Sequence, residues 1–155
     1  DVPEIGRRIH EMPKYPNLEF LQRDDGEQFR RCVQAYLACI YFVDHQVGRV
    51  VKALQASQYA DDTIIVLFSD HGYHLGEKDR VSKHSLCNEA TRVPMIISRP
   101  GDETPKRCDR PVGLIDLYPT LIELCGLPAR SANSGLSLVP LLDDPSAEFR
   151  DAVLV

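Results

Sequence analysis

The sequence lacks any long apolar segment and any excess of basic residues, and each absence excludes a class of protein. No apolar run approaches the roughly 18 residues that a membrane-spanning helix requires, so we expect no membrane span. The formal net charge is −5, and the basic residues are scattered along the chain. Because a nucleic-acid-binding surface needs clustered positive charge, we expect no nucleic-acid partner.

Cysteine pairs are also lacking. The five cysteines are an odd number, and no two form a C-x-x-C pair, which argues against a zinc knuckle and against a complete disulfide framework. We expect most of them to pack as small buried side chains.

What remains is typical of a folded domain with its own core. The chain has 155 residues, of which 43% are hydrophobic and 26% charged. Residues 1–26 carry three prolines and few periodic apolar positions, so they read as an irregular, linker-like segment. There is no initiator methionine, and the last residues stop inside an apolar run, so we expect the chain to be truncated at both ends.

The apolar pattern of residues 27–155 predicts an α/β fold. Between residues 27 and 56, apolar side chains recur at three- and four-residue steps, as in one long amphipathic helix. Residues 63–68 and 93–98 are continuous apolar runs, which is typical of strands covered on both faces. Further elements are expected as strands at 111–114 and 152–155 and as helices at 115–125 and 136–142. This order favours a mainly parallel sheet.

The long polar loop between the two main strands is the first candidate site. Loops of this length in compact domains are usually functional. Asp70 and His71 follow the first strand directly, and a carboxylate and an imidazole there can both bind one cation. The alternative for this pair is structural, with Asp70 capping a turn and His71 hydrogen-bonded and half-buried.

Three more residues of this loop can carry chemistry. The Lys83 ammonium suits a tetrahedral oxyanion, and His84 beside it could protonate a leaving oxygen. His74 lies near them in sequence. Taken singly, all three have the alternative of a solvated, charged loop.

Six motifs follow one another along residues 27–155: V-D-H-Q-V-G-R, S-D-H-G-Y-H-L-G-E-K, R-V-S-K-H-S-L, E-A-T-R-V-P-M-I-I, L-I-D-L-Y-P-T-L and G-L-S-L-V-P-L-L. Together these motifs resemble the second half of the catalytic domain of sulfatases, in the alkaline phosphatase superfamily. The resemblance is greatest to the branch with iduronate-2-sulfatase and choline sulfatase, and it spans about residues 27–155.

The resemblance implies a partial α/β/α sandwich and a site for calcium and sulfate. Asp70 and His71 would be ligands of the calcium ion, Lys83 would contact the sulfate as a catalytic and binding residue, and His84 (catalytic) and His74 (substrate-binding) would lie close by. The substrate would be a sulfated sugar or a similar small sulfate ester. The family also implies export to the periplasm, the lysosome or the cell exterior.

The sulfatase nucleophile is not found in this sequence. Sulfatases use a formylglycine made from the first residue of C/S-x-P-x-R, and none of the five cysteines is followed by proline and arginine at that spacing. The resemblance therefore implies that the nucleophile belongs to a missing N-terminal part of the same enzyme, and that this chain alone is inactive. Two alternatives stay open, namely a phosphodiesterase or phosphonate monoester hydrolase of the same superfamily and a non-catalytic sulfatase remnant.

Overall fold

The computed structural model divides the chain into two compact units, Asp1–Gly101 and Asp102–Val155. It describes residues 3–4, 8, 23–129 and 132–154. Each unit has its own secondary structure.

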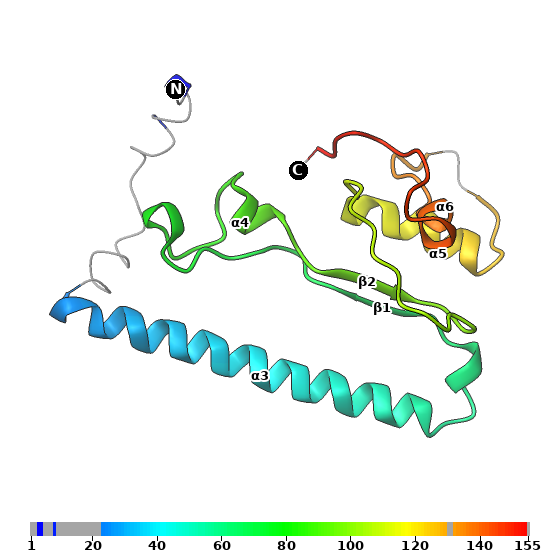
Figure 1. Cartoon of the computed structure of the whole chain (residues 1–155), viewed down its shortest axis with the longest axis horizontal. Coiled ribbons are helices and arrows are strands. Elements are labelled where there is room, and N and C mark those ends of the chain that lie inside the picture. The colour runs from blue at the N-terminus through cyan, green and yellow to red at the C-terminus, as the bar shows by residue number, and fades with distance from the viewer. Residues whose placement is uncertain (1–2, 5–7, 9–22, 130–131, 155) are drawn as a thin grey trace. The chain divides into compact units, whose positions relative to one another are not determined.

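The first unit is built on the long helix α3 (Glu27–Gln55), which confirms the predicted helix to within a residue. The helix runs along the same direction as the strand pair of this unit (Figure 1). Two aromatic side chains join it to the loop that follows β1. Tyr36 stacks on Tyr73 with ring centroids 5.5 Å apart, and the Phe29 ring lies against Gly76.

None of the α3 side chains is buried within the described chain. Leu37, Tyr41 and Phe42 are 56%, 78% and 63% exposed. The amphipathic pattern therefore predicted the helix correctly, but the described residues leave many of its apolar side chains exposed.

The two strands are β1 (Ile65–Phe68) and β2 (Met95–Ser98), close to the predicted runs. They pair antiparallel, from Ile65 opposite Ser98 to Phe68 opposite Met95. The expectation of parallel neighbours is wrong for this pair. A parallel pair needs a crossover that carries the chain back along the sheet, usually on a helix. The connection here holds only short elements and turns back at the end of β1.

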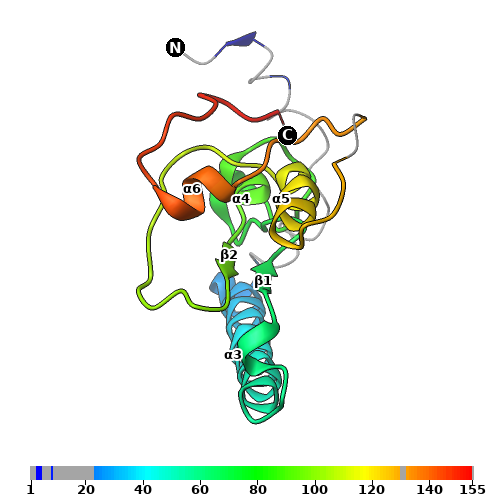
Figure 2. The same cartoon turned by 90° about the vertical axis from the view of Figure 1, so that its right-hand side faces the viewer.

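The second unit contains the short helices α5 (Leu117–Leu124) and α6 (Val139–Asp143), which pack together (Figure 2). Leu117, Ile122, Leu138 and Leu141 are buried and form the core of this unit. Residues 111–113 and 152–154 form no strand, so those two predictions are wrong. An isolated apolar run of four residues pairs only where a neighbouring strand edge is available.

A buried carboxylate ties the second unit together. Asp116 is fully buried and accepts hydrogen bonds from the backbone N–H groups of Gly113, at 2.8 Å, and Leu136, at 2.9 Å. It also pairs with Arg150. Next to it, the buried Thr120 hydroxyl donates to the Asp116 carbonyl and accepts from the N–H of Leu138. Segments up to 34 residues apart are thereby held at one point.

Two predictions from composition have different outcomes. Cys39, Cys108 and Cys125 are exposed and Cys32 and Cys87 are half-buried, so the expectation of buried cysteines is wrong. Within the described ranges, no helix combines the length and apolar character that crossing a membrane requires, as expected.

Candidate functional site

The candidate site is the loop from Ser69 to Pro94, between β1 and β2. It contains the 3-10 turn η3 (Glu77–Asp79) and the single helical turn α4 (Asn88–Thr91). Backbone hydrogen bonds fold the loop on itself, from the N–H of His74 to the Ser82 carbonyl at 2.9 Å and from that of Gly76 to the Arg80 carbonyl at 2.8 Å. These bonds give the loop a defined backbone conformation.

Gly72 fixes the start of the loop against α4. Its N–H donates to the Ala90 carbonyl at 2.7 Å, and a Cβ at this position would lie 2.2 Å from the Glu89 carbonyl oxygen. No side chain fits in that space. Glycine here allows the backbone beside Asp70 and His71 to touch the backbone of α4.

Three of the predicted site residues come together at the end of β1. The His71 Nε2 atom lies 2.8 Å from the Lys83 Nζ and 3.8 Å from the Asp70 Oδ2. Lys83 is twelve residues further along the chain, so the folded loop brings it back to the strand end.

The hydrogen bonds of His71 determine its tautomer. Its Nδ1 lies 2.7 Å from the Gly72 carbonyl, which can only accept, so Nδ1 carries the proton. Nε2 then holds a lone pair, and the Lys83 ammonium donates to it. An imidazole held in this way by a backbone carbonyl has the orientation common to metal-ligating histidines.

These residues fit part of a divalent cation site. The Asp70 side chain is 82% exposed, so its carboxylate oxygens are accessible, and the lone pair of His71 is on the same side. Calcium takes six to eight oxygen ligands, so Asp70 and His71 can supply only a minority of the donors that it prefers.

His74 has a different environment. It is fully buried, and its Nδ1 donates to the Glu77 carbonyl at 3.1 Å. Its Nε2 accepts from the Ser85 hydroxyl at 2.7 Å. Both ring nitrogens are thus engaged in holding the loop, and the predicted contact with substrate stays a prediction.

His84 is exposed beside Lys83, and its backbone carbonyl accepts from Arg80 at 3.5 Å. Its predicted role as an acid also stays a prediction.

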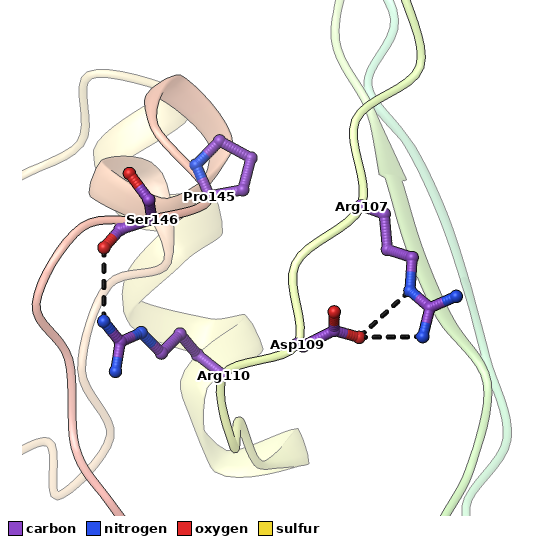
Figure 3. Close-up of a pocket in the computed structure, with 5 residues that line it drawn as sticks. All are labelled: Arg107, Asp109, Arg110, Pro145 and Ser146. Atoms are coloured by element: carbon purple, nitrogen blue, oxygen red, sulfur yellow. Dashed lines mark hydrogen bonds and ion pairs between the residues drawn. The ribbon is translucent and has the colours of Figure 1, made fainter.

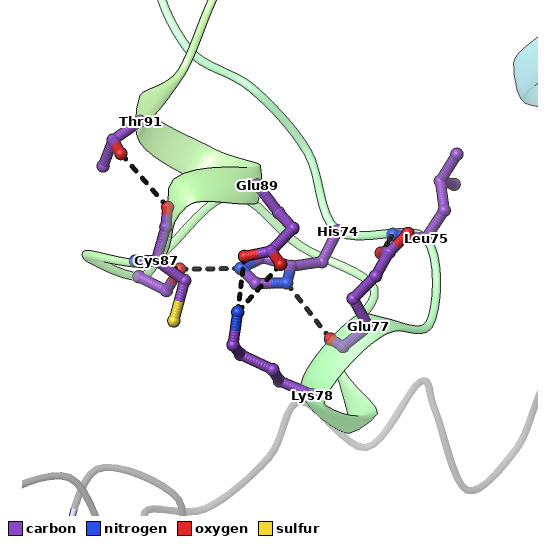
Figure 4. A network of polar contacts seen from close by, with 8 residues as sticks. His74, Leu75, Glu77, Lys78, Cys87, Glu89 and Thr91 are labelled. Carbon is purple, nitrogen blue, oxygen red and sulfur yellow. Dashed lines mark hydrogen bonds and ion pairs between the residues drawn. The ribbon is translucent and has the colours of Figure 1, made fainter.

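The loop also contains an ion pair, between Lys78 and Glu89, that the sequence pattern does not reveal. Lys78 Nζ contacts both Glu89 oxygens, at 2.8 and 2.7 Å (Figure 4). The hydrogen bond between the two groups lowers the pKa of Glu89 and raises the pKa of Lys78, because it favours the charged form of each. The partners are eleven residues apart, and only the folded loop brings them together.

A separate hollow of about 420 Å³ lies in the second unit and contains none of the predicted site residues (Figure 3). Arg107 faces Asp109 with an N–O distance of 2.9 Å, and Arg110 donates to the Ser146 carbonyl at 3.2 Å. Both arginines are therefore engaged within the unit itself.

Sequence comparisons place the chain among known proteins. The family model described as Sulfatase matches residues 8–127. A protein named "Sulfatase" from Formosa agariphila is 45% identical over 142 residues, which cover 92% of this chain and 28% of that protein. A choline-sulfatase from Rhizobium meliloti is 36% identical, with coverage of 92% and 30%. The chain thus spans about three tenths of the length of these curated relatives.

Solved structures give the same result. A 2-O GAG sulfatase superposes with a TM-score of 0.73 and 31% identity, covering 83% of this chain and 29% of that one. A phosphonate monoester hydrolase from Silicibacter pomeroyi reaches 0.70 and 35%, with coverage of 76% and 23%. A protein in complex with its substrate D-glucosamine-2-N,6-O-disulfate reaches 0.65 and 30%, with coverage of 77% and 24%. The α/β fold of these neighbours is alkaline phosphatase-like, as predicted.

Proposed function

Because the chain belongs to the sulfatase family, we propose that it supplies part of the active site of a calcium-dependent sulfuric ester hydrolase. The observation that carries this proposal is the meeting of Asp70, His71 and Lys83 at the end of β1. An exposed carboxylate, an imidazole lone pair and an ammonium group there provide a cation-binding side and an anion-binding side, with Lys83 hydrogen-bonded to His71 and Asp70 3.8 Å from it.

In this proposal each residue has a distinct task. Asp70 and His71 are two ligands of the cation, and a bound calcium ion would supply polarisation of the sulfate oxygens. Lys83 places a positive charge beside the sulfate and stabilises the negative charge that develops on its oxygens. The hydrogen bond from His71 Nδ1 to the Gly72 carbonyl keeps the proton off Nε2. The Nε2 lone pair, which accepts from Lys83 in this structure, becomes a cation ligand when Lys83 turns to the sulfate.

The rest of the site belongs, in this proposal, to a further part of the same enzyme. Asp70 and His71 supply fewer ligands than the six to eight oxygens that calcium prefers. The sequence also holds no C/S-x-P-x-R nucleophile motif. The exposed apolar side chains of α3 support such a partner, since burying them against another segment is favourable. We therefore expect this chain alone to be inactive.

A sulfated sugar is the proposed substrate class. The support is the neighbour in complex with D-glucosamine-2-N,6-O-disulfate and the 2-O GAG sulfatase. The second candidate is hydrolysis of a phosphonate monoester, which the similarity to the Silicibacter pomeroyi enzyme favours.

The test is a chimera in which this chain replaces the matching stretch of the Formosa agariphila protein. We expect the chimera to hydrolyse sulfate esters, to lose activity with a calcium chelator and to regain it with added calcium. Phosphonate monoester hydrolysis that exceeds sulfate ester hydrolysis would favour the second candidate. The 155-residue chain assayed by itself should show no turnover of an aryl sulfate and only weak calcium binding, and turnover above blank would contradict the proposal.

A further inference from the structure

A second group of metal-ligating side chains lies in the same loop, apart from Asp70 and His71. It consists of His74, Cys87 and Glu89, which we call the His–Cys–Glu cluster. One ligand atom from each residue lies within 4.8 Å of the others. His74 is fully buried, while Cys87 and Glu89 are half-buried, and Figure 4 shows the three side chains gathered between α4 and η3.

The donor set of the cluster indicates which ion it would take. One imidazole nitrogen, one thiol sulfur and one carboxylate oxygen are the ligands of zinc sites, whereas calcium prefers oxygen alone. Zinc bonds of about 2.0–2.3 Å in a tetrahedral site place the ligand atoms roughly 3.5 Å apart. A contraction of roughly 1 Å would therefore close the cluster around an ion.

The histidine is already in the tautomer that a metal ligand needs. Nδ1 of His74 donates to the Glu77 carbonyl, so the lone pair is on Nε2, which is on the side of the ring that faces Cys87 (Figure 4). The Ser85 hydroxyl donates to that lone pair at 2.7 Å. A hydroxyl is a weak competitor for it, because it can turn to another acceptor.

The stronger competitor is Lys78. Its ammonium contacts both oxygens of Glu89, so it occupies the carboxylate that an ion would use. The lowered pKa of Glu89 means that this carboxylate is already ionised near neutral pH. An ion bound to one of its oxygens would repel Lys78, so the lysine should lower the affinity of the site.

We propose that the His–Cys–Glu cluster is a binding site for a thiophilic divalent cation of the zinc type. Binding releases the proton of the Cys87 thiol to solvent and gives a thiolate, an imidazole nitrogen and a carboxylate oxygen as ligands, with water completing the coordination. The bound ion would link His74 to α4 and so stiffen the loop that carries Lys83. The argument for this cation site does not use the proposed sulfate ester hydrolysis, so a negative result for one proposal does not contradict the other.

The first test is a titration of the full chain with Co²⁺, in which binding is measured by the thiolate-to-cobalt charge-transfer absorption. We expect one equivalent of bound cobalt, displaced by Zn²⁺. Cys87→Ser should abolish the absorption, and Glu89→Gln should weaken binding at least about tenfold. Cys39→Ser, which removes an exposed thiol of α3, is the matched control and should bind as the unchanged chain does.

Loss of cobalt binding could also arise from misfolding. The second test therefore uses a variant that is expected to bind cobalt more tightly. Lys78→Met removes the competing ammonium and should tighten cobalt binding roughly two- to fivefold, which is the equilibrium effect of one exposed ion pair. The proposal is overturned if Cys87→Ser retains the absorption, if Cys39→Ser loses it, or if Lys78→Met fails to tighten binding.

Discussion

The two units of the chain each contain a fully buried polar side chain, but the two use it differently. In the second unit, Asp116 joins segments separated by 20 and 34 residues and lies beside an apolar core. In the first unit, His74 joins residues at most 11 positions away, in a loop most of whose charged residues are exposed. Asp116 thus joins segments that are farther apart in the sequence than those joined by His74.

The difference separates residues that maintain the fold from those proposed to act on substrate. A buried carboxylate with an arginine and two N–H donors has no surface to offer a ligand, so Asp116 is structural. Asp70 and Lys83 have the opposite environment, since both are exposed and adjoin the half-buried His71. Replacing a residue of the first kind should cost stability, and replacing one of the second kind should cost activity.

The largest effect on stability is expected from Asp116→Asn. The amide keeps the size of the side chain, but it leaves Arg150 without a charged partner and turns a donor toward the Gly113 N–H. Breaking such a buried pair costs about 3–5 kcal/mol. Urea unfolding followed by circular dichroism measures the loss. Asp109→Asn, at an exposed ion pair, is the control and should change stability by less than about 0.5 kcal/mol. Equal effects of the two substitutions would contradict the claim that the buried Asp116, unlike the exposed Asp109, maintains the fold of the second unit.

A smaller loss is expected from Gly72→Ala. The added Cβ meets the Glu89 carbonyl oxygen at 2.2 Å, so backbone must move, and overpacking of this kind costs about 1–3 kcal/mol. The control is Gly48→Ala in α3, where nothing lies within 4 Å of the added atom. That substitution should stabilise the helix by about 0.5–1 kcal/mol. The unfolding temperatures of the two variants should therefore shift in opposite directions, and an unchanged or raised unfolding temperature for Gly72→Ala would show that Gly72 is not confined.

The smallest effect is expected from the Lys78–Glu89 pair, through pH. Because the folded pKa of Glu89 is lowered, its stabilising contribution is present above the ordinary value of 4.5 and disappears as pH falls through the folded pKa. The raised pKa of Lys78 limits the contribution at the alkaline end, above 10.5. Glu89→Gln should thus lower the unfolding temperature slightly near about pH 7, and this difference should shrink as pH falls below 4.5 and vanish once pH is below the folded pKa of Glu89. A difference that persists in acid would rule out the ion pair as its cause.

Elements that depend on local pattern could be predicted from the sequence. The long helix, both strands of the sheet and the helix around Leu117 follow from runs of apolar residues at helical or strand spacing. The antiparallel pairing could not, because strand direction depends on the path of the connection, and the loop Ser69–Pro94 turns back without a crossover helix. The short apolar runs at 111–114 and 152–155 also misled, since a strand requires a partner edge that the pattern does not specify.

The candidate site shows the same division. The adjacent residues Asp70 and His71 stand out in the sequence, and Lys83 joins them because the loop returns to the strand end. The buried position of His74 and the pairing of Lys78 with Glu89 depend on contacts eleven residues apart, for which no periodic pattern exists. The His–Cys–Glu cluster likewise appears only in the folded loop.

The most direct test of the proposed site is Lys83→Ala in the chimera with the Formosa agariphila protein, measured as kcat/KM for a sulfate ester. Loss of an electrostatic stabiliser of the transition state should lower kcat/KM by about 100-fold or more. Lys52→Ala, which removes an exposed lysine of α3, should leave it unchanged. Equal kcat/KM values for the two variants would contradict the placement of Lys83 beside the sulfate.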